Sequence, residues 1–251
     1  MDLQLAGKSV IVTGGSRGIG FATADAFAAE GAHVAICARD AGRLKEAGEE
    51  LSRHGGRVYQ APCDVGDVDG LKAFVDQAAD ALGGLDVLVN NPSGFGRDDN
   101  EAGWQAGLEI DLMASVRAGW YAVPHMKARG GGAIIHITSI SGLRASTRTP
   151  PYGAVKAAMI QYAQSQAHNL AADNIRVNTI APGSVEFPGG VWDQVRQHDR
   201  AMYDQIQSTI PWNRYGRPEE IADVALFLAS ARASWVTMAW STFAPSSSRS
   251  A

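Results

Sequence analysis

The chain has 251 residues, of which 45% are hydrophobic and 19% are charged, with a formal net charge of -4. This size and hydrophobic content predict a single domain with one large core. A weakly acidic chain lacks the basic surface that binds nucleic acid or an anionic membrane, so neither is expected as a partner. Its two cysteines form neither a disulfide framework nor a metal-ligand pattern. We expect a small-molecule partner and no metal.

Short runs rich in β-branched residues alternate with longer alanine-rich amphipathic segments. Strands are expected at residues 8–14, 32–38, 56–62, 85–90, 132–138 and 175–182. Helices are expected at residues 19–30, 43–53, 68–82, 104–129 and 152–172, and again in the segment after Pro211. Because the strand runs are apolar on both faces, the pattern predicts an α/β fold with a doubly wound parallel sheet and helices on both faces, in a single domain of residues 1–251.

Two later segments depart from this alternation. Residues 186–212 carry aromatic and apolar residues among polar ones, which predicts a lid over a substrate; a surface helix docked by its aromatic residues is the alternative. Residues 237–251 are rich in Ala, Pro, Ser and Arg and are expected to form an atypical, poorly ordered tail. The N-terminal residues lack the features of a secretory signal, and no stretch approaches a membrane span, so we expect a cytoplasmic protein.

The first expected strand leads directly into the sequence TGGSRGIG, Thr13 to Gly20, and then into a helix. Gly14, Gly18 and Gly20 allow a tight turn and a close approach to a pyrophosphate, while the helix N-terminus offers free N–H groups. An isolated glycine pattern would be an ordinary turn. Its place between the first strand and first helix of the series predicts a Rossmann-like dinucleotide site.

The end of the second expected strand indicates which dinucleotide is preferred. Ala38 stands where an acidic residue would bind a ribose 2′-hydroxyl, and Arg39 follows it. Together with Arg17 in the glycine-rich loop, Arg39 could grip a 2′-phosphate, which favours NADP over NAD. The alternative is that both arginines are solvated loop residues, and the nearby Asp40 weakens the positive charge.

Tyr152 and Lys156 lie one helical turn apart in RTPPYGAVKAA, where a loop becomes a helix. A phenol that protonates a ketone oxygen needs a pKa nearer to working pH than its ordinary value of roughly 10. The Lys156 ammonium would stabilise the phenolate from the same helix face. Ser139, at the end of the fifth strand, could bind the same substrate oxygen. His136 precedes it on an apolar strand and is expected to be a core residue.

These motifs resemble the short-chain dehydrogenase/reductase family in its single-domain form. The matching stretches are TGGSRGIG, Asp64-Val65, NNPSG, SISG, YGAVK and PGSV, in the family's order. The resemblance implies that Tyr152 is the general acid/base, that Ser139 orients the carbonyl, and that Lys156 holds the nicotinamide ribose. Together with the arguments above, it places the cofactor site at Gly14, Ser16, Arg17, Gly18, Ile19, Gly20, Arg39, Asp64, Val65, Asn90, Tyr152, Lys156, Pro182, Gly183 and Val185.

Three departures from the family pattern alter these expectations. The loop after the fourth strand, Asn90 to Gly94, is one residue longer than the family's NNAG. Asp111 replaces the family's fourth catalytic residue, an asparagine, and we expect a working proton relay with altered pH dependence, because a carboxylate paired with Lys156 would change the effect of that cation on Tyr152. Met238 replaces the glycine of a VTG turn, and the altered ending puts the family's homo-oligomeric assembly, a tetramer or a dimer, in doubt.

We therefore expect an NADP-preferring oxidoreductase that moves a hydride between the nicotinamide and a secondary alcohol or ketone. A 3-oxoacyl-thioester reductase and a sugar or polyol dehydrogenase both remain open within this class. The alternative from a different class is a catalytically impaired NADP(H)-binding protein that acts as a sensor or a partner subunit.

Overall fold

The computed structural model describes residues 2–242, and seven strands within them form one parallel sheet. The strand order is β3-β2-β1-β4-β5-β6-β7. The bounds are β1 (Ser9–Thr13), β2 (His33–Ala38), β3 (Val58–Pro62), β4 (Val87–Asn90), β5 (Gly132–Ile137), β6 (Ile175–Ala181) and β7 (Trp240–Thr242). All neighbouring strands are parallel, which confirms the predicted fold class and the six predicted strands, β1 to β6.

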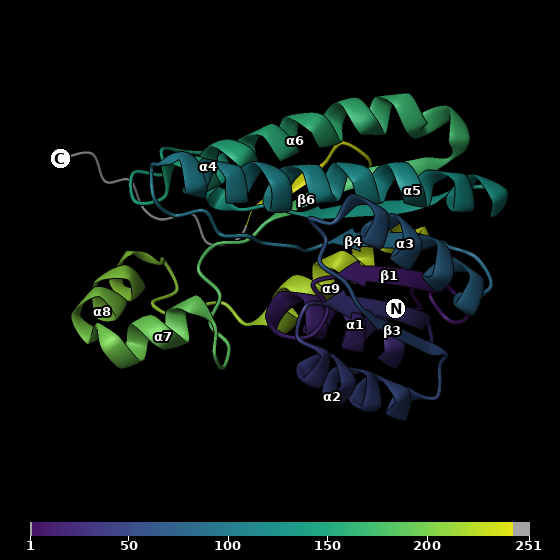
Figure 1. Ribbon diagram of the computed structural model, residues 1–251, viewed down its shortest axis with the longest axis horizontal. Coiled ribbons are helices and arrows are strands. Elements are labelled where there is room, and N and C mark those ends of the chain that lie inside the picture. The colour runs from purple at the N-terminus through teal and green to yellow at the C-terminus, as the bar shows by residue number, and fades with distance from the viewer. Residues whose placement is uncertain (1, 243–251) are drawn as a thin grey trace.

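Helices cover both faces of the sheet (Figure 1). One layer consists of α1 (Gly18–Ala29), α2 (Ala41–Leu51) and α9 (Pro218–Ala229), and the other consists of α3 (Val68–Leu82), α5 (Ala114–Ala128) and α6 (Pro150–Leu170). Strand β1 shows why the sheet is apolar on both sides. Val10 and Val12 pack into the first layer, whereas Ile11 packs into the second, and all three are fully buried.

The strand order reverses beside β1, and this reversal positions the site. The chain runs from β1 outward through β2 and β3, then returns to place β4 on the other side of β1. The carboxyl ends of β1 and β4 therefore lie next to each other, with Thr13 paired to Asn90. Ligands of doubly wound folds bind at such a switch point.

The helix predicted at residues 104–129 is interrupted. The chain forms α4 (Glu101–Ala106), then a π-helical segment (Gly107–Met113), and then α5. A π-helical turn inside a helix shifts the register of its hydrogen bonds and is frequent at functional sites. It places Asp111 in the interior, where 1% of the residue is exposed.

The predicted lid region forms two short helices, α7 (Val191–His198) and α8 (Arg200–Thr209), which lie to one side of the layers (Figure 1). They pack through a small apolar cluster of their own, in which Tyr203, Ile210 and Tyr215 are buried. The region is therefore a separate packing unit rather than part of the main core. No helix among residues 2–242 combines the length and apolar composition needed to cross a membrane.

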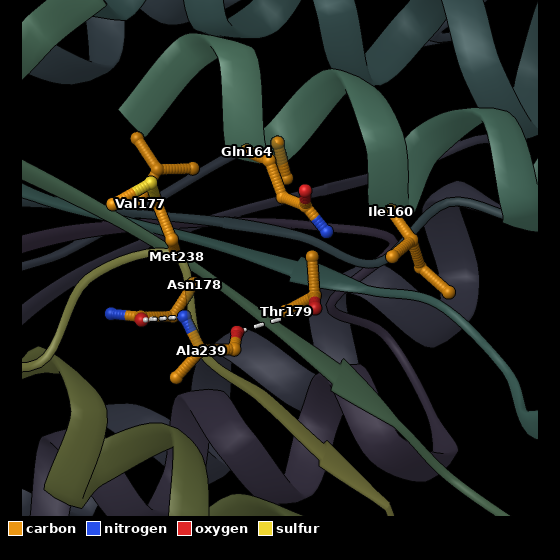
Figure 2. Close-up of a pocket in the computed structure, with 8 residues that line it drawn as sticks. Ile160, Gln164, Val177, Asn178, Thr179, Met238 and Ala239 are labelled. Carbon is orange, nitrogen blue, oxygen red and sulfur yellow. Dashed lines mark hydrogen bonds between the residues drawn. The ribbon is translucent and has the colours of Figure 1, made fainter. Parts of the chain in front are cut away.

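The sequence predicts an irregular tail at residues 237–251, but residues 240–242 form strand β7. Residues 243–251 lie outside the described part of the chain. The side chain of Asn178 on β6 fixes the approach, because its Nδ2 donates to Val236 O (2.9 Å) and its Oδ1 accepts from Ala239 N (3.1 Å). Met238 has a φ of 60°, the left-handed conformation that favours glycine. Figure 2 shows this junction, where Met238 and Ala239 line a shallow crevice beside α6.

Candidate active site

Helix α6 carries Tyr152 and Lys156 on one face. Prolines at positions 150 and 151 are compatible with the first helical turn, where backbone N–H groups have no partner within the helix. Lys156 is 3% exposed, and its Nζ lies 5.5 Å from the centroid of the Tyr152 ring. The same Nζ donates to Ile137 O (3.3 Å). Lys156 is therefore buried and Tyr152 is half-buried, so the predicted pair is not a solvated surface pair.

Ser139 reaches this pair from the end of β5. It is buried, its hydroxyl lies near enough to the Tyr152 hydroxyl to lower the pKa of the phenol, and its Oγ accepts from Ser141 N (3.1 Å). A backbone bond from Ile140 N to Pro182 O (3.1 Å) brings the predicted segment Pro182 to Val185 beside the serine. The structure thus brings Ser139, Tyr152 and Lys156 together, as the sequence predicts.

Asp111 completes the group from the π-helical segment. Its Oδ1 lies 3.1 Å from Lys156 Nζ, and both side chains are almost completely buried. Burial alone would lower the pKa of Lys156, but Asp111 and Tyr152 outweigh burial and raise it. The lysine is therefore held in its charged form.

The pKa of Tyr152 lies above its ordinary value. Burial is the largest cause, and the negative charge of Asp111 acts in the same direction. Lys156 and the nearby Ser139 hydroxyl lower the pKa of Tyr152, but they do not outweigh burial. The expected lowering by Lys156 is present, while the net direction is opposite to the one predicted from the pair alone.

The glycine-rich loop fits the phosphates of a dinucleotide. A Cβ atom at Gly20 would lie 2.2 Å from Gly14 O, so this turn excludes a side chain. Helix α1 begins at Gly18, and its N-cap residue, Arg17, makes no side-chain cap within the described residues, which leaves the first N–H groups available to an anion. The predicted Ser16 and Ile19 lie in this same loop and first turn.

The two asparagines of the loop after β4 direct their side chains to different places. The Asn90 side chain points into the core, where its Nδ2 donates to Ser115 O (3.3 Å) and to His136 Nδ1 (3.3 Å). The neighbouring Asn91 instead contacts the glycine-rich loop, through Nδ2 to Gly14 O (3.1 Å). Sequence reasoning missed Asn91; the lengthened loop was the available signal.

Phe187 is a second residue of this region that sequence reasoning left out of the cofactor site. Three atoms of its ring lie 2.5 to 2.8 Å from the place that a Cβ of Gly18 would occupy. Arg17 Nη1 also donates to Gly189 O (3.2 Å). The chain at residues 187–189 is therefore docked on the glycine-rich loop.

The residues predicted at the adenosine end lie where β2 and β3 end. Arg17 and Arg39 are both exposed, whereas Val65 is partly buried. Asp64 is exposed, and its Oδ1 accepts from Gly66 N (3.0 Å), which shapes the turn after β3. In the described part of the chain, His, Cys, Asp and Glu side chains do not gather in a group of three that could hold a metal.

Comparisons with known proteins agree with this geometry. A family model described as enoyl-(acyl carrier protein) reductase matches residues 14–242. A 3-oxoacyl-[acyl-carrier-protein] reductase of Chlamydia pneumoniae is 37% identical over 242 residues, which cover 94% of this chain and 95% of that protein. The 7alpha-hydroxysteroid dehydrogenase of Escherichia coli K12 is 34% identical, with coverage of 94% and 92%.

Solved structures lead to the same family. L-sorbose reductase from Gluconobacter frateurii, solved with NADPH and L-sorbose, superimposes with a TM-score of 0.92 at 33% identity, and the match covers 100% of both chains. Named relatives of the chain are dehydrogenases and reductases that act on CH–OH or C=O groups. The chain belongs to the short-chain dehydrogenase/reductase family and is a nicotinamide-dependent oxidoreductase of that family.

Proposed function

We propose that Tyr152 is the general acid/base in hydride transfer between NADP(H) and a secondary alcohol or ketone. The observation that carries this proposal is the convergence of three side chains: the Ser139 hydroxyl lies near the Tyr152 hydroxyl and lowers its pKa, and Lys156 lies one helical turn away, buried and charged. A protein that only bound a dinucleotide would not need a proton donor held in this way. The catalytically impaired alternative is therefore not favoured.

Each side chain has a distinct task in the proposed reaction. The nicotinamide, when bound, supplies or accepts the hydride. In the direction of reduction, Tyr152 Oη donates its proton to the carbonyl oxygen, and the Ser139 hydroxyl donates a hydrogen bond that orients the same oxygen. Lys156 Nζ stabilises the phenolate that remains, and Asp111 keeps this lysine charged. Lys156 and the N–H groups at the start of α1 would hold the ribose and the phosphates of the cofactor.

The charges at the end of β2 support a preference for NADP. Arg17 and Arg39 provide two exposed guanidinium groups. Asp40, which would repel a 2′-phosphate, is engaged elsewhere: it caps α2 by accepting from Arg43 N (3.1 Å) and lies 3.5 Å from Arg43 Nε. Asp40 is thus neutralised locally, Arg39 stays available, and Arg17 keeps N–H groups for a phosphate beyond the one that it donates to Gly189 O.

The preference is measured as the ratio of kcat/KM for NADPH to that for NADH. The wild type is expected to prefer NADPH, and Arg39→Ala is expected to reduce the ratio at least tenfold, as the loss of a charge-assisted contact predicts. Arg53→Ala, an exposed arginine near the other end of α2, is the matched control and should leave the ratio unchanged. Equal ratios in Arg39→Ala and the wild type would refute the assignment of Arg39.

The reaction is tested by following NADPH absorbance with purified enzyme and a panel of ketones. Because the relatives include a 3-oxoacyl thioester reductase, a sorbose reductase and a hydroxysteroid dehydrogenase, the panel covers acyl thioesters, ketoses and cyclic ketones. Consumption of NADPH with at least one of these classes is expected, and the class reduced fastest names the substrate type. NADPH that binds without being consumed by any ketone would favour the impaired binding protein instead.

We further infer a lid, an oligomer and a cytoplasmic location. Residues 186–212 are proposed as the lid because they pack as their own unit and dock on the glycine-rich loop.

A homotetramer, with a dimer as the alternative, is supported by Trp120 on α5. The residue is 56% exposed, and tryptophan is enriched at protein–protein interfaces. Native mass spectrometry should give about four times the mass of the 26.5 kDa chain; a monomer would contradict the assembly. Cell fractionation tests the location.

A further inference from the structure

Asp111 uses both carboxylate oxygens to join two parts of the site. Its Oδ1 lies 3.1 Å from Lys156 Nζ. Its Oδ2 accepts hydrogen bonds from the backbone N–H groups of Gly94 (3.0 Å) and Phe95 (3.2 Å). The carboxylate is buried, so bulk water does not compete for these contacts. Asp111 therefore links the catalytic lysine to the loop that follows β4.

The chemistry of these neighbours favours a carboxylate over an asparagine at position 111. The Lys156 ammonium and the two backbone N–H groups are all donors. An asparagine offers one acceptor oxygen and one donating NH₂ group, so it would satisfy one side and direct a donor at the other. The lengthened loop and the aspartate are two departures from the family pattern, and the contact between them makes them parts of one arrangement.

The loop lies close against α4, the helix that leads into the π-helical segment carrying Asp111. A Cβ at Gly94 would lie 2.7 Å from Ala106 O, and a Cβ at Gly96 would lie 2.0 Å from Gly103 O. Phe95, between these glycines, has a φ of 46°, a left-handed conformation that is strained for a bulky residue. Its N–H bond to Asp111 is one of the contacts that maintain this conformation.

This conformation brings the Phe95 side chain to the catalytic tyrosine. The rings of Phe95 and Tyr152 meet edge to face, with centroids 5.0 Å apart and an interplanar angle of 72°. The guanidinium of Arg97 lies 5.0 Å from the centroid of the Phe95 ring. Phe95 is thus fixed by its backbone and by contacts of its ring.

We propose that Asp111 is a positioning residue that holds the loop at residues 94–97 so that Phe95 forms a wall of the substrate site beside Tyr152. This inference rests on the proposed role of Tyr152 as acid/base. A substrate oxygen that reaches the Tyr152 hydroxyl places one substituent of its carbonyl carbon near this wall. An aromatic wall selects for an apolar or planar substituent at that position.

Amide hydrogen exchange tests the link between Asp111 and the loop. In Asp111→Ala, which removes the acceptor from both N–H groups, the amides of Gly94 and Phe95 are expected to exchange at least tenfold faster than in the wild type. Asp86→Ala is the matched control, because Asp86 is also buried, accepts a backbone N–H from Ser9 (2.9 Å) and pairs with cations, but lies at the opposite end of β4. Exchange of the Gly94 and Phe95 amides at the wild-type rate in Asp111→Ala would overturn the proposal.

A second measurement reports on the catalytic tyrosine without any turnover. The charged groups that face Tyr152 are Lys156 and Asp111, while His136, which faces Lys156, is neutral above a pKa of about 4. NMR titration of ¹³C-labelled tyrosine, assigned with Tyr152→Phe, should give a lower pKa for Tyr152 in Asp111→Asn, because a negative charge is removed. An unchanged or higher pKa would contradict the arrangement.

Phe95→Ala tests the wall itself and does not depend on the buried ion pair. With 4-fluorophenylalanine in place of Phe95, the ¹⁹F chemical shift should change in Tyr152→Leu and in Asp111→Asn, but not in Asp86→Asn. An unchanged ¹⁹F chemical shift in Tyr152→Leu would overturn the contact between the two rings.

Among ketones that the wild type reduces, Phe95→Ala should raise KM at least fivefold for aryl ketones and less for small ketones. A uniform effect on all ketones would refute selection by Phe95. Because the NMR and exchange results require no turnover, failure of this proposal is distinguishable from failure of the proposed reaction.

Discussion

His136 offers a quantitative test of the polar network beneath the site. Its Nδ1 accepts from Asn90 Nδ2 (3.3 Å), and its Nε2 lies 3.0 Å from Gln166 Oε1, so the neutral ring satisfies both neighbours. Burial is the main cause that lowers its pKa from 6.5 to about 4; Lys156 acts in the same direction, and Gln166 opposes it. The folded protein therefore resists protonation of this ring.

The sign and size of the effect follow from this pKa. Between pH 6.5 and 4 the unfolded chain binds a proton at His136 that the folded chain does not, so stability is complete above pH 6.5 and falls as the pH falls toward 4. A difference of this size corresponds to about 3 kcal/mol, a large part of the 5–15 kcal/mol typical of a domain. Acidification alone should therefore weaken the fold appreciably.

Urea unfolding at a series of pH values measures this term. The free energy of unfolding should fall by about 3 kcal/mol more in the wild type than in His136→Gln between pH 6.5 and 4. His168→Gln, an exposed histidine on α6, is the control and should follow the wild type. If His136→Gln loses as much stability on acidification as the wild type, the buried neutral histidine is not the cause.

Two further substitutions test the packing around the site. Gly18→Ala should lower the free energy of unfolding by about 2–3 kcal/mol, because Gly18 has a φ of 56° and the new Cβ would meet the Phe187 ring. Adding Phe187→Ala should recover about 1 kcal/mol. Strict additivity of the two effects in urea unfolding would refute the docking of Phe187 on Gly18. The Arg176 guanidinium donates to Leu228 O (2.6 Å) and Ala229 O (3.1 Å) at the end of α9, so Arg176→Ala should lose about 3 kcal/mol of stability. This loss corresponds to a fall in Tm of about 6–12 °C, and a shift below about 2 °C by calorimetry would contradict the assignment.

Much of the sheet could be predicted because its strands are buried on both faces. An apolar run such as residues 8–14 has few alternatives to a central parallel strand, and the structure places β1 within it. Periodicity does not distinguish hydrogen-bond registers within a helix, so residues 104–129 were predicted as one helix without the π-helical segment. Strand β7 was missed because contacts from Asn178, distant in sequence, determine its approach.

The candidate site shows the same division between local and long-range information. Tyr152 and Lys156 could be placed together because four residues on a helix share one face. Ser139 could be added because the ends of parallel strands meet at one edge of the sheet. The contact of Asp111 with Phe95 could not be predicted, because it depends on the conformation of an irregular loop. The fall of the Tyr152 pKa predicted from Lys156 alone likewise left out burial, which only the structure reveals.

The central claim is that Tyr152 moves the proton during hydride transfer, and Tyr152→Phe tests it most directly when binding and turnover are measured on the same preparation. The account predicts that the variant binds NADPH with an affinity within about threefold of the wild type, because the glycine-rich loop is unchanged, while kcat falls by at least a hundredfold with any ketone that the wild type reduces. Turnover by Tyr152→Phe within tenfold of the wild type, with NADPH still bound, would contradict the account and assign the proton to another group.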